Sequence, residues 1–176
     1  MEYSEVPVSQ AYQLLTPGGL VLVCTRSEDG RYDLAPVAWN CPLDYEPVSR
    51  VLVVCSPEHR SYEDLVESGE FVLALPTLEQ RLMVEETGSV SGHEVDKYAK
   101  FKIEAFAAHK VDALVPESVA AWLECRLLRV VVEGSSAVVM REVLRAQALP
   151  DAWKLRLHYA REGLWYAPGP ALGGDR

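Results

Sequence analysis

The chain has 176 residues, which is enough for one domain with a hydrophobic core and too few for two large ones. Hydrophobic residues make up 49% of the sequence and charged residues 24%, a composition that excludes the disordered and fibrous classes. The net charge of −9 repels polyanions, so we expect no nucleic-acid partner, although a few cations and backbone amides still allow a small anionic ligand.

Strand patterns dominate the first half of the chain. Residues 20–24 (LVLVC) and 50–55 (RVLVVC) are short β-branched runs, as in strands buried on both faces. The Asp29-Gly30 turn signal leads into residues 31–37 and predicts a hairpin. We expect a further buried strand at 71–75, and a long antiparallel hairpin from 124–132 and 137–145.

Short helices are predicted from their capping signals. Ser61 with Asp64 forms one capping-box pattern, and Gly69 is placed to end that helix. The same pattern recurs at Thr77 and Gln80, and it predicts a second helix that stops at Gly88. A weaker helix is expected at 95–102 and a single turn after Pro116, whereas residues 151–161 fit both helix and strand and stay unassigned.

Six or so mostly antiparallel strands with small helices predict a mainly β fold, a closed barrel with helical insertions. A parallel doubly wound sheet needs regular alternation of strand and helix, which fails after residue 120. We expect one domain over residues 1–166. The Gly/Pro-rich residues 167–176 are expected to be a loose C-terminal tail.

Several functional classes lose their support. No apolar run reaches roughly 18 residues and residues 1–5 lack a signal-peptide pattern, so we expect a cytoplasmic protein with no membrane partner. There is no GxGxxG, P-loop, HExxH or GxSxG motif, and the four histidines are too scattered to predict a metal site. The cysteines lack CxxC spacing, which favours buried thiols over a reactive one.

Residues 34–42 (LAPVAWNCP) are unusual for the end of a strand. Two prolines remove backbone donors, and Trp39 adds a large planar surface. A planar heteroaromatic ligand would fit here, with its ring edge hydrogen-bonded to the main chain and to the Asn40 amide. In the alternative interpretation, Trp39 only plugs the end of the barrel and Asn40 makes a turn bond.

Two further segments offer groups for a phosphate. Residues 56–62 (SPEHRSY) lie between a buried strand and a helix, where free amides and the donors of Ser56, His59 and Arg60 gather. In residues 88–97, small residues allow close approach to a ligand and Lys97 supplies a point charge. The alternatives are an ordinary Ser61 cap with a solvated Arg60, and a plain loop.

The chain resembles the flavin reductase-like, FMN-binding split-barrel family, including flavoredoxin-type proteins. The resemblance is carried by the three segments described above together with the run 14–18 (LLTPG), the Gly-Glu-Phe at 69–71 and the VSG at 90–92. The resemblance covers about residues 12–145. It implies an antiparallel split β-barrel, a homodimer, and FMN bound near the subunit interface. Strands 130–132 and 138–139 offer apolar faces for such a pairing.

The resemblance also assigns cofactor-binding residues, although no catalytic residue. By this analogy the isoalloxazine and ribityl contacts come from Val37, Ala38, Trp39 and Asn40; the phosphate contacts from Ser56, His59, Arg60, Ser61 and Tyr62; and the closing contacts from Ser91, Gly92 and Lys97.

The leading functional hypothesis is a flavin reductase that takes hydride from NAD(P)H onto bound FMN and passes it to an acceptor, with an oxygenase or another acceptor protein as a further partner. The alternative is a non-enzymatic FMN carrier without its own nicotinamide site. A third, less favoured hypothesis is oxidation of a pyridoxamine phosphate.

Overall fold

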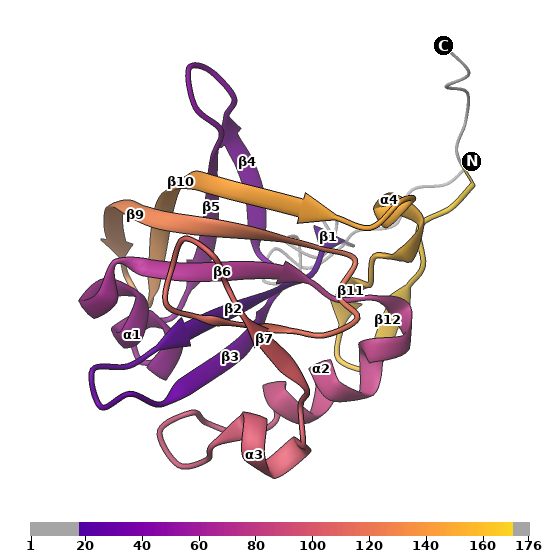
Figure 1. Ribbon diagram of the computed structural model, residues 1–176, viewed down its shortest axis with the longest axis horizontal. Coiled ribbons are helices and arrows are strands. Elements are labelled where there is room, and N and C mark those ends of the chain that lie inside the picture. Colours follow the sequence, from indigo (N-terminus) through magenta and orange to yellow (C-terminus); the bar gives the residue numbers. More distant parts are fainter. Residues whose placement is uncertain (1–17, 171–176) are drawn as a thin grey trace, which may run out of the picture.

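The computed structural model describes residues 18–170. Its seven-stranded antiparallel sheet has the order β3-β2-β6-β9-β10-β5-β4 (Figure 1). The bounds of these strands are β2 Val21–Arg26, β3 Tyr32–Val37, β4 Asn40–Asp44, β5 Arg50–Cys55, β6 Glu70–Leu75, β9 Ala121–Glu133 and β10 Ser136–Ala148. The mainly β expectation is confirmed, and the long predicted hairpin is β9–β10.

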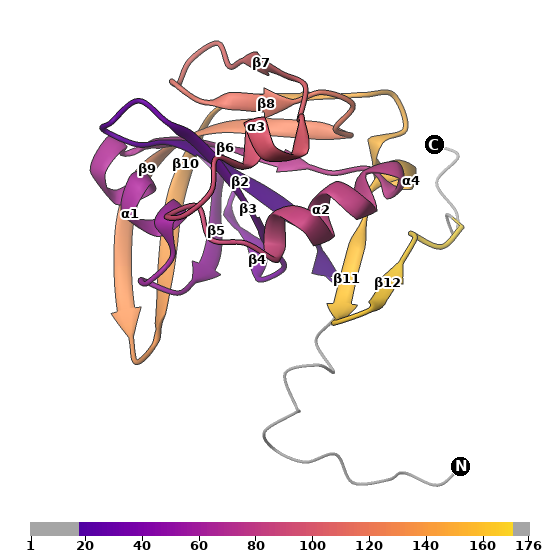
Figure 2. The ribbon, with the colours of Figure 1, turned by 90° about the horizontal axis from the view of Figure 1, so that it is seen from below.

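The remaining elements are short. Two small sheets contain β1 Gly18–Gly19, β11 His158–Arg161 and β12 Leu164–Tyr166, and β7 Ala105–Ala107 with β8 Leu114–Pro116. The helices are α1 Arg60–Ser68, the 3₁₀ turn η2 Leu78–Gln80, α2 Arg81–Gly88, α3 Lys97–Phe101 and α4 Ala152–Leu155. In both views α1 lies at one end of the molecule and the β11–β12 hairpin at the other (Figures 1 and 2).

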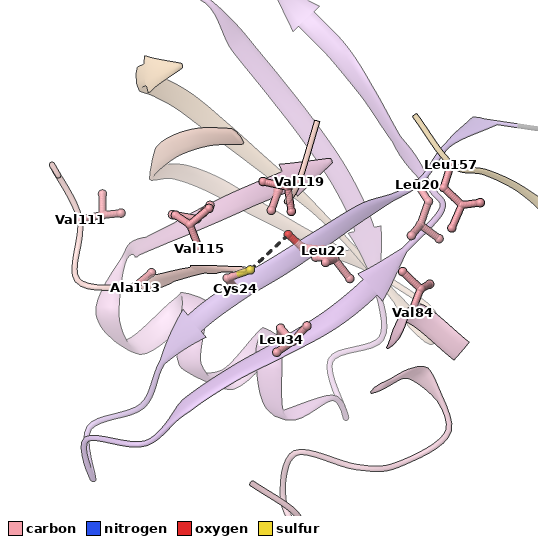
Figure 3. Close-up of a cluster of buried hydrophobic side chains, with 12 residues drawn as sticks. Leu20, Leu22, Cys24, Leu34, Val84, Val111, Ala113, Val115, Val119 and Leu157 are labelled. Carbon is pink, nitrogen blue, oxygen red and sulfur yellow. Dashed lines mark hydrogen bonds between the residues drawn. The ribbon is translucent and has the colours of Figure 1, made fainter. Parts of the chain in front are cut away.

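Strand β2 shows why the apolar runs lack alternation. Its successive side chains enter two different cores, because the strand is covered on both faces. Leu22 and Cys24 belong to the core that packs under α2 and the 111–119 segment (Figure 3), whereas Val21 and Val23 belong to the core inside the barrel. Strand β6 divides in the same way, since Val72 joins the first core and Phe71 the second.

The helix signals were right in position but not always in detail. Gly69 ends α1 in the left-handed conformation at φ 68°, and the Thr77–Gln80 capping box is present. Ser61 is not a cap, because α1 begins one residue earlier and its N-cap position is His59. The side chain of Asp64 instead accepts a hydrogen bond from the Thr25 hydroxyl on β2 at 3.0 Å and forms an ion pair with Arg60 at the start of α1.

The other local expectations divide in the same way. Residues 117–118 form a turn after Pro116, and residues 151–161 contain both a short helix, α4, and a strand, β11. Residues 167–170 have no regular structure, and the remainder of the expected tail lies outside the described residues, as does 14–17. Within residues 18–170, no helix is long and apolar enough to span a membrane.

Candidate functional site

Three surface compartments meet at Pro36 on strand β3. A polar compartment of about 370 Å³ lies between α1 and the 87–92 segment. A smaller one of about 270 Å³ lies along residues 37–39 and shares His59 with the first. The largest, of about 510 Å³, shares Ala38 with the small one and Gly88 with the polar one. Strand β3, through Pro36, therefore contributes to the walls of all three compartments.

Ten of the twelve residues expected at the cofactor site line the first two compartments. Those in the polar compartment are His59, Arg60, Ser61, Ser91, Gly92 and Lys97, and those in the small one are Val37, Ala38, Trp39 and Ser56, with His59 again. Segments separated by up to sixty residues in the sequence are thus brought together around β3.

The start of helix α1 presents backbone donors to the polar compartment. The first helical hydrogen bonds are donated by the amides of Tyr62 and Glu63 to the His59 carbonyl oxygen. The amides of Arg60 and Ser61 precede these bonds, and the N-terminal amides of a helix have no acceptor within the helix. Because His59 provides no side-chain cap, these two amides are available to an anion.

The two cations of this compartment are already paired with aspartates. Arg60 Nε lies 2.7 Å from Asp64 Oδ1, and Lys97 Nζ lies 3.2 Å from Asp33 Oδ1. Lys97 Nζ also donates to the Leu34 carbonyl oxygen at 2.8 Å. The compartment therefore carries two nearly neutral ion pairs rather than two unpaired positive charges.

Burial raises the pKa of both aspartates. For Asp33 this effect exceeds the attraction of Lys97, and for Asp64 it exceeds the hydrogen bond from Thr25 and the attraction of Arg60. Asp33 also packs directly against Gly92, where an added Cβ would lie 2.4 Å from Oδ2. The absence of a side chain at this position is what allows the Asp33–Lys97 pair to form the compartment wall.

The small compartment has an aromatic edge that is open to solvent. Trp39 is 49% exposed, so it does not plug the barrel end. Ser135 and Ser136, at the tip of the β9–β10 hairpin, also line this compartment.

Asn40 and Tyr62 do not line either compartment. Asn40 Nδ2 donates to the carbonyl oxygens of Gly19 at 2.7 Å and of Val37 and Ala38 at 3.3 Å, which is the turn bonding considered as an alternative. Tyr62 packs against the barrel core.

Several lining residues were missed by sequence reasoning. Asp33 was the one with a readable signal, since it is a buried charge in an otherwise apolar strand. Other missed residues reach the compartments only through the tertiary fold, among them Thr87, Ser135 and Ser136, and Glu85, Tyr159, Glu162 and Trp165 of the largest compartment.

A family model described as flavin reductase like domain matches residues 14–165. An FMN-binding protein from Thermus thermophilus with bound p-hydroxybenzaldehyde superposes with a TM-score of 0.84, at 26% identity and 99% coverage of each chain. A flavoredoxin of Desulfovibrio vulgaris superposes with a TM-score of 0.84 over 99% of this chain and 97% of that one, and at 20% identity it shows the fold alone. The predicted antiparallel split barrel is thereby confirmed.

The uncharacterized protein YddH of Escherichia coli is 30% identical over 125 residues, which are 70% of this chain and 66% of that protein. The chain spans 53 to 66% of the length of the curated relatives that it matches. Because the family model covers most of the sequence and the fold agrees, the chain belongs to the flavin reductase like domain family.

Proposed function

We propose that residues 1–166 form one FMN-binding domain that acts as an oxidoreductase of the flavin reductase type, with NAD(P)H as electron donor. The observation that carries this proposal is the convergence of ten expected cofactor residues on two adjoining compartments around Pro36. The Thermus thermophilus relative is an FMN-binding protein of nearly the same length, which supports the choice of cofactor.

The polar compartment suits the phosphate end of FMN. The free amides of Arg60 and Ser61 point out of the start of a nine-residue helix, whose dipole favours an anion at that end. Arg60 is partly exposed, and its side chain is held at the compartment by Asp64. The donor set is therefore of the right chemistry for a phosphate, while the paired aspartates limit how much net positive charge it meets.

The small compartment suits the flavin ring system. Trp39 offers a flat surface, and the Val37–Ala38 backbone runs along the wall that the two compartments share at Pro36. Bound FMN supplies the hydride and electron chemistry that the ordinary side chains of this chain lack. The residues described here bind and orient it, and they exclude water from one face.

A non-enzymatic FMN carrier is the second candidate. Carboxylates rather than cations line the largest compartment, next to the proposed ring site, and they do not favour the diphosphate of a nicotinamide dinucleotide. The homodimer expected for the family, a cytoplasmic location and an oxygenase or other acceptor partner remain proposals. For the dimer, Leu128 and Val132 are exposed on β9, whereas Val139 lies in the barrel core and is not part of such a face.

The test begins with reconstitution. The purified protein should take up FMN and absorb at about 450 nm, the flavin region. Arg60→Ala should weaken FMN binding about 10-fold to 100-fold, because a shielded charge-assisted contact is worth roughly 1.5 to 3 kcal/mol. The affinity for riboflavin, which has no phosphate, should stay within about twofold. The Arg60→Ala/Asp64→Asn double variant controls for the buried carboxylate left behind, and Arg129→Ala controls for charge.

Equal losses of both flavins would contradict the phosphate assignment, and a protein with no flavin affinity would end the proposal. Anaerobic addition of NADH or NADPH then separates the two candidates. Bleaching of the flavin absorbance is expected for a reductase, whereas a carrier would keep its colour.

A further inference from the structure

We propose that the polar compartment takes up a proton when it binds the phosphate of FMN, and that the carboxylate of Asp33 holds this proton. The inference rests on the proposed function, because the phosphate is that of the cofactor proposed above. The proton comes from the solvent and converts the carboxylate into a carboxylic acid, so the net charge of the protein rises by one.

The ion pairs leave the free compartment with little net charge. Lys97 Nζ lies 3.2 Å from Asp33 Oδ1, and Arg60 Nε lies 2.7 Å from Asp64 Oδ1, so each cation already has a counterion. A phosphate dianion placed here is attracted by two cations and repelled by two carboxylates. Neutralising one carboxylate lets its cation act on the phosphate instead.

Asp33 is the carboxylate that adjoins the phosphate. It lines the polar compartment together with Lys97, whereas Asp64 does not line it. Asp33 is only 6% exposed, and its Oδ1 accepts no well-aligned hydrogen bond within the described part of the chain. Asp64 is better supplied with donors, since the Thr25 hydroxyl donates to its Oδ2 at 3.0 Å. A buried carboxylate oxygen without a donor favours the neutral acid, so Asp33 is the better proton acceptor.

The charged and titratable groups around Asp33 come from each element packed against it. They are Lys97 and Tyr98 of α3, Arg60 and Asp64 of α1, and Cys24 of β2. Burial raises the pKa of Asp33 more than the attraction of Lys97 lowers it. Burial also raises the pKa of Cys24 to about 12 and that of Tyr98 well above its ordinary value, so neither side chain gains or loses a proton near neutral pH.

An incoming phosphate acts strongly on this equilibrium. The two charges of a dianion about 8 Å away, at an effective dielectric constant of about 40, shift the protonation of Asp33 about 30-fold towards the acid. Lys97 Nζ keeps its hydrogen bond to the Leu34 carbonyl oxygen at 2.8 Å, and its other N–H groups can then turn to the phosphate. A flavin without a phosphate causes no such shift, so Asp33 makes the compartment specific for a phosphorylated ligand.

Calorimetry in two buffers measures the proton directly. FMN and riboflavin are each titrated into the flavin-free protein at about pH 6.5, in two buffers that differ in their enthalpy of ionisation and contain no phosphate. The difference in heat gives the number of protons taken up with each flavin. We expect at least about 0.3 proton for FMN, from the 30-fold shift, and about none for riboflavin.

A site of unpaired cations would give the opposite sign. The second pKa of a phosphate monoester is about 6, so part of the FMN carries a proton at about pH 6.5 and such a site would release it. Net release with FMN, or equal values for the two flavins, would therefore overturn the inference.

Variants identify the group that gains the proton. Asp33→Asn should abolish the uptake, because an amide gains no proton in this range, whereas Asp112→Asn, on an exposed ion pair with Arg26, should retain it. His59→Gln should also retain it, although His59 lines the compartment and histidine commonly gains a proton near neutral pH. Uptake that is lost in His59→Gln and kept in Asp33→Asn would refute the assignment.

Two further measurements need no variant. The phosphorus NMR shift of bound FMN should be that of the dianion between about pH 6.5 and pH 8, and the shift of the monoanion would place the proton on the phosphate and contradict the role of Asp33. The ratio of FMN to riboflavin affinity should fall as the pH rises over this range, because the FMN complex binds more protons than its free partners. A constant or rising ratio would also count against the inference.

Failure of the proposed function is read separately. A protein that binds neither flavin refutes the proposed function, and this inference with it. Binding of FMN without proton uptake refutes this inference alone.

Discussion

Arg141 is the most unusual charge in the barrel. Its side chain is 0% exposed, and Nε, Nη1 and Nη2 have no hydrogen-bond partner among the described residues. The guanidinium carbon lies 4.1 Å from the centroid of the Phe71 ring. Burial lowers the pKa of Arg141 to about 10, so it is still charged at neutral pH. We predict that Arg141→Met raises the free energy of unfolding.

The size of the effect follows from two opposing contributions. A pKa lowered from 12.5 to about 10 corresponds to a desolvation cost of about 3 kcal/mol. A desolvated contact between a cation and a ring returns about 2 kcal/mol. Methionine keeps a long side chain and adds a sulfur contact to Phe71 of roughly 0.3 to 1.5 kcal/mol, so the expected gain is about 1 to 2.5 kcal/mol.

The pH dependence has a definite sign. Because Arg141 is a base whose pKa is lower in the folded state than in the unfolded state, its cost is present at every pH below about 10. It fades only as the pH rises from about 10 towards 12.5. The advantage of Arg141→Met should therefore be constant between about pH 6 and pH 9.

Urea denaturation at fixed protein concentration measures this prediction. Arg129→Met, on the exposed side of β9, is the control and should stay within about 0.5 kcal/mol of the wild type. Phe71→Leu should lower the free energy of unfolding more in the wild-type protein than in the Arg141→Met variant, since only the wild-type protein loses a contact between a cation and the Phe71 ring. A loss of stability in Arg141→Met would refute the reasoning, and would show that the guanidinium has a partner such as a bound anion.

Three shorter predictions concern other features. Light scattering at micromolar concentration should show twice the 19.6 kDa chain mass, and a species of 19.6 kDa alone would contradict the dimer. Iodoacetamide at pH 8 should label the exposed Cys41 first. Burial raises the pKa of Cys24 and Cys125 to about 12, so both thiols should stay unlabelled until the protein unfolds. Mass spectrometry identifies which cysteine carries the label. Gly92→Ala should lower stability by roughly 1 to 3 kcal/mol, because the new methyl group meets Asp33. Gly169→Ala is the comparison for added volume alone, because nothing lies within 4 Å of that position and its backbone is not left-handed.

Six strands of the large sheet were predictable because each of these six is encoded by a local run. Residues 50–55 form β5 with the expected bounds, and residues 71–75 form all but the first residue of β6. Strand β4 was missed because Pro42 argues against a ladder position. The structure places β4 at the edge of the sheet, where one missing donor costs little.

The site was predictable only in part. Its segments could be located by their glycines, serines and prolines, since these residues mark places where the backbone approaches a ligand. Their partners could not, because the pairing of Lys97 with Asp33 depends on how α3 packs against β3. The same holds for Trp165 and Glu85, which are 80 residues apart and meet only in the folded chain.

The Asp33–Lys97 pair leads to a prediction that separates charge from structure in the polar compartment. Asp33 is 6% exposed and Lys97 is 3% exposed, so Asp33→Asn leaves a buried ammonium without its counterion and should cost roughly 3 to 5 kcal/mol of stability.

The same change removes a negative charge from the wall of the proposed phosphate site. Two unit charges about 8 Å apart at an effective dielectric constant of about 40 interact by about 1 kcal/mol, so FMN should bind about fivefold more tightly relative to riboflavin. Both affinities are measured well below the melting temperature, with Asp112→Asn, on an exposed ion pair with Arg26, as the control. A fall in the ratio of FMN to riboflavin affinity would mean that Asp33 serves the phosphate by orienting Lys97, and that its charge is outweighed by that role.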